Sequence, residues 1–508
     1  MNNSIIRYIL GCVLKIETIL LLFPCLVAII YKEDKGIYYF ITACICLVLG
    51  ILLTLKKPES LVFYLKEGSA ATALSWIIMS LFGALPFWLS GEIPSFTDAL
   101  FETVSGFTTT GASILSDVEA LSHCSLFWRS FTHWIGGMGV LVFLLAVIPL
   151  SGGSQINLMR AESPGPSVGK LVPKIKTTAR LLYIIYFGMT ILQIIFMLAG
   201  GLELFDTLAI TFGTAGTGGF GIKNDSIGGY SPYIQWVVAI FMVLFGVNFN
   251  MYYLFLYRKW RKALSIEEVH TYFMLIIISV TVIFINIAKT IGSASDALRH
   301  AFFQVSTLIT STGFSTTDYD LWPQTSKTVL IVVMFIGACA GSTGGGIKVS
   351  RVIILVKSIK KEMASYIHPK CIQKIKMDGK PVEHEIVRAT NVYFVAFTII
   401  FFLSVLAVSI DNKDFTTNFT AVLATINNMG PGLAEAGPAQ NFGSFSIFSK
   451  IVLMFDMLAG RLELFPLLIL FHPGIWKELF IKKRKPGQKK YKKVSSTHQP
   501  PSPHSWGN

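Results

Sequence analysis

The chain has 508 residues, of which 53% are hydrophobic and only 14% are charged, and its mean hydropathy is +0.60. An ordinary soluble chain carries about 25% charged residues, so this composition excludes a set of soluble domains and indicates a protein whose solvent is lipid. The formal net charge of +14 does not indicate nucleic-acid binding, because the basic residues gather in short stretches between apolar runs, as they do in cytoplasmic loops of membrane proteins.

The apolar runs predict a protein that crosses the membrane many times. A helix needs about 20 apolar residues to cross a bilayer, and ten stretches are candidates. They lie at about 8–30, 37–55, 70–90, 131–150, 180–200, 232–256, 270–290, 328–356, 389–410 and 446–471. Lysine and arginine concentrate after the even-numbered stretches and acidic residues after the odd-numbered ones, which predicts that both termini face the cytoplasm.

Four of the connections are too long and too apolar to be plain loops. Each combines a short apolar stretch with a cluster of Gly, Thr, Ser or Asn. In order they read FETVSGFTTTGAS (101–113), LAITFGTAGTGGF (208–220), FFQVSTLITSTGFS (302–315) and AVLATINNMGPGL (421–433). A helix of ten to twelve residues is too short to span, so each connection predicts a re-entrant short helix and loop.

These connections recur at a spacing of about a hundred residues. Aligning Gly111, Gly218, Gly313 and Gly430 predicts an all-α polytopic membrane protein with four pseudo-symmetric repeats around one pore, plus two extra N-terminal transmembrane helices. The expected boundaries are 1–60 for the N-terminal addition, 61–160, 161–262, 263–375 and 376–480 for the repeats, and 481–508 for a basic, disordered cytoplasmic tail.

The clusters suit the binding of a dehydrated monovalent cation. Backbone carbonyl oxygens from several segments can replace the hydration shell of such an ion without fixed charge, and glycine allows the necessary backbone conformations. The expected selectivity filter consists of Thr109, Thr110, Gly111, Gly216, Thr217, Gly218, Ser311, Thr312, Gly313, Asn428, Met429 and Gly430. Gly432 is an alternative to Gly430, and helix packing through small residues is an alternative role for all these glycines.

Two further features indicate a gate. The eighth stretch contains Gly344, Gly345 and Gly346, and each glycine destabilises a helix by about 1 kcal/mol relative to alanine, so we expect a loop that can move rather than a helix. Arg461 lies inside the tenth stretch, where it should face a cavity or form an ion pair with Asp456 or Glu463. Lys348 fits either a cavity charge or a lysine that extends to the cytoplasmic surface.

Four motifs carry a resemblance to a known family. The segments GTAGTGGFG (213–221), GACAGSTGGGIKVSRV (337–352), NNMGPGL (427–433) and MLAGRLELFPLL (457–468) resemble the Trk/Ktr/HKT superfamily of potassium transporters, and within it the bacterial TrkH branch. The resemblance implies potassium uptake across a bacterial inner membrane, a gating loop at the glycine run, and an arginine barrier at Arg461. It also implies a homodimer and a cytosolic, nucleotide-binding, TrkA-like RCK subunit.

The sequence gives weaker support to several other functions. An ion-coupled symporter would need inverted repeats and buried carboxylates, and sodium or ammonium preference is left open by the filter residues. A membrane enzyme would need a polar catalytic cluster, which the sequence lacks. The GxGxxG match at 216–221 lies between apolar stretches rather than in a βαβ unit, and the seven cysteines show no metal-site or disulfide spacing, so we expect K⁺ as the transported ion and no organic cofactor.

Overall fold

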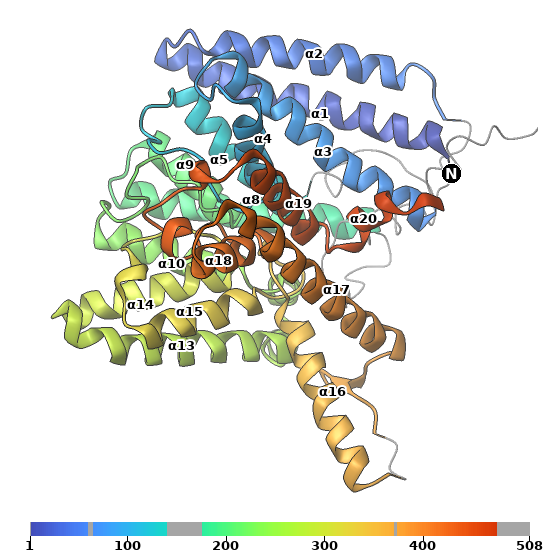
Figure 1. The fold of residues 1–508 in the computed structure, drawn as a ribbon, viewed down its shortest axis with the longest axis vertical. Coiled ribbons are helices and arrows are strands. Elements are labelled where there is room, and N and C mark those ends of the chain that lie inside the picture. Colours follow the sequence, from blue (N-terminus) through green and yellow to red (C-terminus); the bar gives the residue numbers. More distant parts are fainter. Residues whose placement is uncertain (1, 59–63, 140–174, 370–372, 475–508) are drawn as a thin grey trace, which may run out of the picture.

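The computed structural model describes residues 2–58, 64–139, 175–369 and 373–474. The predicted tail at 481–508 and most of the basic stretch at 160–180 lie outside these ranges. The described chain is mostly helical (Figure 1), which confirms the all-α prediction. Within the described ranges the strands form one antiparallel hairpin, made of β1 (Lys376–Met377) and β2 (Lys380–Pro381).

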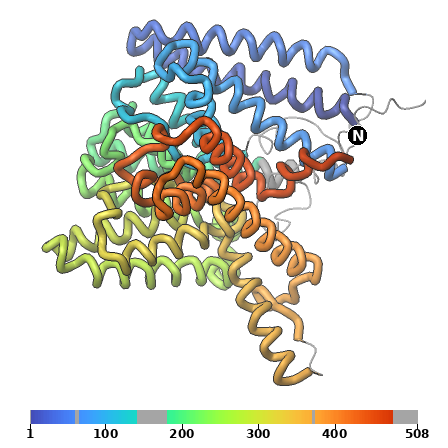
Figure 2. Tube along the Cα trace, viewed as in Figure 1, coloured from blue at the N-terminus to red at the C-terminus, as the bar shows by residue number. Residues whose placement is uncertain are grey.

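The first two helices form a hairpin along one flank of the molecule (Figure 2). Helix α1 (Asn3–Tyr31) packs along α2 (Gly36–Thr54), and α1 also contacts α3 (Leu65–Leu89). Gly11 and Gly50 lie where the two helices cross, and a Cβ atom on either would stand 3.0 Å from the carbonyl oxygen of the other. Small residues at such a crossing let the helix backbones approach closely within lipid.

After this hairpin the same order of elements occurs four times: a long helix, a short helix, a loop and a second helix. The long helices are α3, α8 (Ile175–Ala199), α13 (Glu267–Ile291) and α17 (His384–Val408). The short helices are α4 (Phe96–Phe107), α9 (Leu204–Ala215), α14 (Ala294–Ile309) and α18 (Phe415–Ile426). The second helices are α5 (His123–Met138), α10 (Pro232–Phe245), α15 (Gln324–Ile336) and α19 (Ile447–Arg461).

The short helices cannot cross a bilayer. Three of them have 12 residues and α14 has 16, so at 1.5 Å per residue most are about 18 Å long, against a hydrocarbon core about 30 Å thick. Ser95, Ser293 and Asp414 cap the first, third and fourth of them by accepting a backbone hydrogen bond. Three of the four short helices therefore have their own start signal, whereas Glu203 at the start of α9 makes no such side-chain bond.

The long helices account for most of the predicted spans. Within the described ranges, six helices are long and apolar enough to cross a membrane, and a seventh candidate is the pair formed by α10 and α11 (Phe249–Leu256), which is bent by 89°. The predicted stretches at 328–356 and 446–471 are not continuous helices. The stretch at 131–150 is described only as far as residue 139.

Breaks in the second helices are more frequent than the sequence suggested. One break lies where the sequence predicts it, because residues 337–348, which include the glycine run at 344–346, separate α15 from α16 (Val349–Ile367). In addition, Asn248 caps α11 with its side chain after a turn at Gly246. Residues 462–464 separate α19 from α20 (Phe465–Leu468), where Glu463 and Leu464 have positive φ angles of 56° and 64°.

The remaining elements are short connections. They are α12 (Trp260–Leu264) and the 3-10 turns η1 (Tyr319–Leu321), η2 (Ser409–Asp411), η3 (Ala434–Ala436), η4 (Phe442–Ser444) and η5 (Ile469–Phe471). Helix α16 projects away from the rest of the molecule, whereas α17 to α20 lie between the flank of α1 to α3 and the flank of α13 to α15 (Figure 1). The loops after the four short helices come together in the interior.

Candidate functional site

Each short helix ends in the same backbone motif. Residues Thr109, Thr217, Ser311 and Asn428 all have left-handed φ angles, of 55°, 53°, 56° and 53°. The next residue in each loop donates its N–H to the carbonyl five positions earlier, at distances of 2.8 to 2.9 Å. This is the Schellman arrangement, in which glycine normally takes the left-handed position. Non-glycine residues there cost of order 1–3 kcal/mol each and persist only where the surroundings fix them.

A glycine follows two residues after each left-handed position. Gly111, Gly219, Gly313 and Gly430 have φ angles of 81°, 79°, 91° and 83°, and each stands four residues beyond the end of its short helix. The second loop is thus displaced by one residue from the predicted alignment, and Gly219 rather than Gly218 is the equivalent glycine. In the fourth loop the equivalent is Gly430 and not Gly432. The sequence could not choose between adjacent glycines because the choice depends on where the helix ends.

The four loops meet in a closed ring. A Cβ atom added to each of these glycines would collide with a backbone carbonyl oxygen of the next loop. The pairs, each given as the glycine and then the residue that carries the carbonyl, are Gly111 and Gly218, Gly219 and Thr312, Gly313 and Met429, and Gly430 and Thr110. The separations are 2.6 Å at Gly313 and 2.9 Å at Gly430, and at the other two the atoms would overlap. The fourth loop therefore returns to the first.

An open cavity of about 220 Å³ lies against this ring. All four of these glycines line it, as do backbone and hydroxyl groups of the residues that follow them. Its described lining contains two cations, Arg129 and Lys223, and no carboxylate. The amino group of Lys223 lies 4.2 Å from the centre of the Tyr230 ring. A neutral ring of backbone groups thus adjoins a mildly basic vestibule.

A buried ion pair joins the first loop to the second. Arg129, on α5, is paired with Glu102 on α4 at 2.5 Å, with exposed side-chain fractions of 3% and 0%. The other carboxylate oxygen of Glu102 accepts the N–H of Ile114 at 3.0 Å. Arg129 also donates to the carbonyl of Gly221 at 2.7 Å, and its guanidinium stacks 3.7 Å from the centre of the Phe220 ring. This pair was not predicted from the sequence, although Glu102 is an acidic residue within an apolar short helix.

Equivalent bonds join the other loops. The N–H of Ile227 donates to the carbonyl of Ser315 at 3.0 Å, which ties the second loop to the third. The N–H of Phe442 donates to the carbonyl of Ser113 at 2.8 Å, which ties the fourth loop to the first. The outer rim of the ring is therefore closed by hydrogen bonds in the same cyclic order as its inner contacts.

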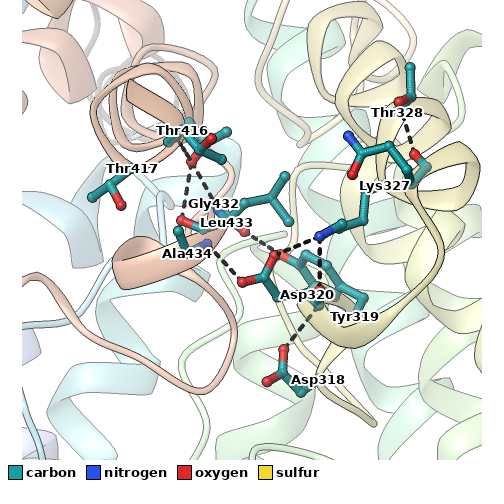
Figure 3. Close-up of polar contacts among 12 residues, drawn as sticks. Asp318, Tyr319, Asp320, Lys327, Thr328, Thr416, Thr417, Gly432, Leu433 and Ala434 are labelled. Atoms are coloured by element: carbon teal, nitrogen blue, oxygen red, sulfur yellow. Dashed lines mark hydrogen bonds and ion pairs between the residues drawn. The ribbon is translucent and has the colours of Figure 1, made fainter. Parts of the chain in front are cut away.

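Figure 3 shows the contact between the third and fourth loops. The hydroxyl of Tyr319 donates to the carbonyl of Gly432 at 3.1 Å, and the N–H of Ala434 donates to the carboxylate of Asp320 at 3.1 Å. Lys327 donates to the carbonyl of Asp320 at 3.0 Å and lies 3.5 Å from its carboxylate. The carbonyl of Gly432 thus ties the fourth loop to the third.

Asp414 shows how the start of a short helix is held. Its carboxylate accepts the N–H of Thr417 at 3.1 Å and also the hydroxyl of Thr417. The hydrogen bond from the Thr417 side chain holds the pKa of Asp414 below its ordinary value. The ionised carboxylate also favours the positive end of the helix dipole.

The loop at 337–348, hereafter the glycine loop, lies directly beneath the ring. The N–H of Gly345 donates to the hydroxyl of Ser311 at 2.5 Å, and a Cβ atom on Gly344 would stand 2.9 Å from the carbonyl of Thr310. Lys348 is buried, and its amino group donates to the carbonyls of Gly344 and Gly345. The structure therefore places Lys348 inside the protein and not at the cytoplasmic surface.

Arg461 connects three segments below the ring. Its guanidinium donates to the carbonyl of Thr343 in the glycine loop at 3.0 Å and to the carbonyl of Gly137 at the end of α5 at 2.9 Å. It also donates to the carbonyl of Gly136. Of the two carboxylates suggested by the sequence, Glu463 pairs instead with Arg351 on α16, and Asp456 accepts a hydrogen bond from Ser404. The predicted gating residues are thus brought together on the side of the ring opposite the open cavity.

The chemistry of this arrangement suits a weakly held monovalent ion. Among the described residues, no three His, Cys, Asp or Glu side chains are grouped closely enough to hold a metal ion. The ring offers backbone carbonyls and hydroxyls, which are the ligands of alkali-cation filters. Multivalent ions generally require carboxylate or softer ligands as well.

The chain is similar in sequence and in fold to known cation transporters. A family model named TrkH and described as a cation transport protein matches residues 35–477. The Trk system potassium uptake proteins TrkH and TrkG of Escherichia coli strain K12 are 35% and 34% identical to the chain, over 94% of the chain and 100% of each relative. The crystal structure of the potassium transporter TrkH from Vibrio parahaemolyticus superposes with a TM-score of 0.84 at 31% identity, and covers 94% of this chain and 100% of that one.

Proposed function

The chain belongs to the TrkH family of cation transport proteins, and from this premise we propose that it takes up potassium across a bacterial inner membrane through a selective pore. It is a transporter and not an enzyme. The observation that supports the proposal most strongly is the closed cyclic contact of the four loops, since backbone oxygens can replace an ion's hydration only if the segments share one axis.

The proposed filter follows the corrected register. It consists of Thr109, Thr110, Gly111, Thr217, Gly218, Gly219, Ser311, Thr312, Gly313, Asn428, Met429 and Gly430. The ion enters from the open cavity, exchanges water for these oxygens, passes the glycine loop and Arg461, and reaches the cytosol. A membrane potential that is negative inside contributes about 2.3 kcal/mol per charge per 100 mV to this movement.

The glycine loop, Lys348 and Arg461 form the proposed gate and barrier. The loop lies across the path beneath the ring, and its tip is held by Ser311 above and Arg461 beside it. A cationic guanidinium in this position repels a potassium ion, and a loop rich in glycine can change conformation at modest cost.

The assembly is part of the same proposal. We take the chain to be a homodimer with both termini in the cytoplasm and the predicted domain boundaries, controlled by a cytosolic nucleotide-binding RCK subunit. The projection of α16 from the body supports a cytosolic docking role, because this helix follows the glycine loop directly and carries Lys357, Lys360 and Lys361.

Growth rescue tests the function. A bacterium that lacks its own potassium uptake systems should grow at low potassium when it expresses this chain with a Trk-type cytosolic subunit, and growth should fall when the subunit is omitted. Failure of growth with a correctly inserted protein would refute potassium uptake.

An ion-coupled symporter is the second candidate, and one observation favours it. Asp456 is fully buried in α19, where one carboxylate oxygen accepts from Ser404 at 2.7 Å and the other has no hydrogen-bond partner among the described residues. A buried carboxyl can carry a coupling proton. Potassium flux that reverses at the potassium equilibrium potential whatever the proton gradient would exclude this alternative.

A further inference from the structure

A buried carboxylate outside the filter and the proposed gate holds both ends of the glycine loop. Glu268, in the first turn of α13, is only 2% exposed. One of its oxygens accepts the N–H of Ala340 at 2.7 Å and the N–H of Ser350 at 3.1 Å. The two donors belong to the start of the glycine loop and to the first turn of α16. One side chain therefore joins the entry and the exit of the loop.

The loop is closed at this point by a second bond. The N–H of Val349 donates to the carbonyl of Ala338 at 3.1 Å. Residues 338–340 and 349–350, hereafter the neck, are thus linked both to each other and to Glu268. A loop whose ends are tied together moves as one compact unit about its ends, in the manner of an Ω-loop.

The same carboxylate ties the neck to the break in the preceding second helix. The other oxygen of Glu268 accepts the amide of Asn248 at 3.1 Å. Backbone bonds run alongside, from Cys339 N–H to the carbonyl of Gly246 at 3.1 Å and from Phe249 N–H to the carbonyl of Gly341 at 3.0 Å. Three charge-assisted hydrogen bonds fix the position of the neck more firmly than neutral bonds would.

The tip of the loop is held by different contacts. Ser311, Arg461 and the loop's own Lys348 hold residues 343–345, whereas Glu268 holds only the neck. A movement that opens the path beneath the ring can therefore release the tip and leave the neck in place.

From this arrangement we infer that Glu268 is the positioning residue for the gate: it fixes the neck about which the glycine loop turns, and it couples α16 to that loop. This inference rests on the proposed function. Movement of α16 by a cytosolic partner reaches the loop through Ser350 and its bond to Glu268. Without the carboxylate only the tip contacts restrain the loop, so the loop leaves the closed position more readily and the closed state loses its dependence on the partner.

The test compares Glu268→Ala with Glu267→Gln in purified full-length protein in liposomes without a partner. Glu267 is the adjacent acid, is 36% exposed in its side chain and pairs with Lys357, so its change should leave the flux as in the wild type. Glu268→Ala should raise partner-free rubidium flux by about tenfold or more, because it removes all three hydrogen bonds to the charged group, and the loss of even one corresponds to roughly that factor. The potassium-to-sodium flux ratio should stay unchanged, because the filter is not altered. A general loss of structure would instead lower the flux and the ratio together.

A second readout does not depend on transport. Cys339 is buried in the neck, so in a chain whose other six cysteines are replaced it reports exposure of the neck to a small thiol reagent. Glu268→Ala should speed its labelling, and Glu267→Gln should not. If the wild type carries no potassium, the proposed function fails, but the labelling still tests the anchor.

The milder variant covers the case in which Glu268→Ala does not remain monodisperse. Glu268→Gln keeps the size of the side chain but removes the charge and directs an amide donor toward the Asn248 amide. It should give a smaller rise in flux and labelling. Wild-type labelling and flux in the folded Glu268 variants, or a flux that falls together with the ion ratio, would overturn the inference.

Discussion

The carbonyl oxygen of Thr312 occupies the place that a Cβ atom on Gly219 would need. The same relationship, one loop further on, joins the carbonyl of Met429 to Gly313. At both glycines a carbonyl oxygen of the next loop leaves no room for a side chain, so the two positions are equivalent, although the sequence alignment paired Gly313 with Gly218. Any side chain at either position must push the neighbouring loop away from the ring.

We expect Gly219→Ser to reduce the preference for potassium over sodium by about tenfold, as Gly313→Ser should, because a backbone displacement of this kind costs roughly 1–3 kcal/mol. The measurement is the ratio of potassium to sodium flux in liposomes. Gly188→Ala is the matched control, since a Cβ atom at Gly188 on α8 meets nothing within 4 Å and should leave the ratio as it is.

A double substitution distinguishes Gly219 from Gly218. A Cβ atom on Gly218 would overlap the imidazole of His133 rather than another loop. His133→Ala should therefore restore part of the flux ratio that Gly218→Ala removes, and should restore none of the ratio lost in Gly219→Ala. Equal recovery in both backgrounds would argue against the shifted register.

Most of the fold was predictable because its signals are local. Long apolar runs predicted the spanning helices, and the recurrence of short apolar stretches before Gly, Thr and Ser predicted the re-entrant elements. The register error at Gly218 has a physical cause, because the left-handed residue Thr217 is set by the last turn of α9. Sequence composition does not show where that turn ends.

The missed parts of the site depend on distant contacts. Glu102 and Arg129 are 27 positions apart, and each looks like an isolated charge in an apolar segment. The break at 462–464 was missed because Glu463 and Leu464 are not residues that usually take positive φ. The turn is held in part by the pairing of Glu463 with Arg351, which is 112 positions away in the chain.

Arg461→Ala should raise the basal leak of the pore. The substitution removes a positive charge beneath the ring together with the bonds to Thr343 and Gly137, so both the barrier and one restraint on the glycine loop are lost. Partner-free rubidium flux should rise about tenfold or more if roughly 1.4 kcal/mol of barrier is removed. Arg461→Lys keeps the positive charge but not the forked hydrogen-bonding geometry of the guanidinium, so its basal flux should lie between that of the wild type and that of Arg461→Ala. Basal flux equal to the wild type in Arg461→Ala would contradict an arginine barrier.

Glu102→Gln should destabilise the protein strongly. The substitution leaves the Arg129 guanidinium buried without a negatively charged partner. Removing one partner of a buried ion pair typically lowers the free energy of unfolding by about 3–5 kcal/mol. The measurement is the thermal midpoint of the detergent-solubilised protein. The double variant Glu102→Gln with Arg129→Leu should be less destabilised than Glu102→Gln alone, because it removes the uncompensated charge. If the double variant is less stable than Glu102→Gln alone, the loss of stability comes from lost packing and not from the uncompensated charge.

Acid should loosen the fourth short helix through Asp414. Its pKa is lowered in the folded protein by the Thr417 hydroxyl, so the unfolded chain binds more protons in the window between the lowered value and the ordinary value of about 3.9. The stabilisation is present above that window and is lost as pH falls through it. Thr417→Val should have the lower thermal midpoint at pH 6, and the wild-type midpoint should fall more than that of the variant between pH 6 and pH 3, so that the difference between them narrows. Thr417→Ser, which keeps the hydroxyl, should follow the wild type.

Lys223→Gln should increase potassium uptake at low potassium concentration. Lys223 lines the cavity that adjoins the ring. Among the described residues that line this cavity there is no carboxylate, and the charge of the other cation, Arg129, is already balanced by Glu102. A single positive charge in such a vestibule repels the entering ion, and its removal should raise the initial rate by about two- to threefold at low ionic strength, with the gain shrinking as added salt screens the charge. Initial rubidium uptake at two choline chloride concentrations measures both effects. Lys289→Gln, on α13 and away from the cavity lining, should not change the rate. A gain that persists at high salt would mean that Lys223 acts by a local steric contact with the path, and not through its charge.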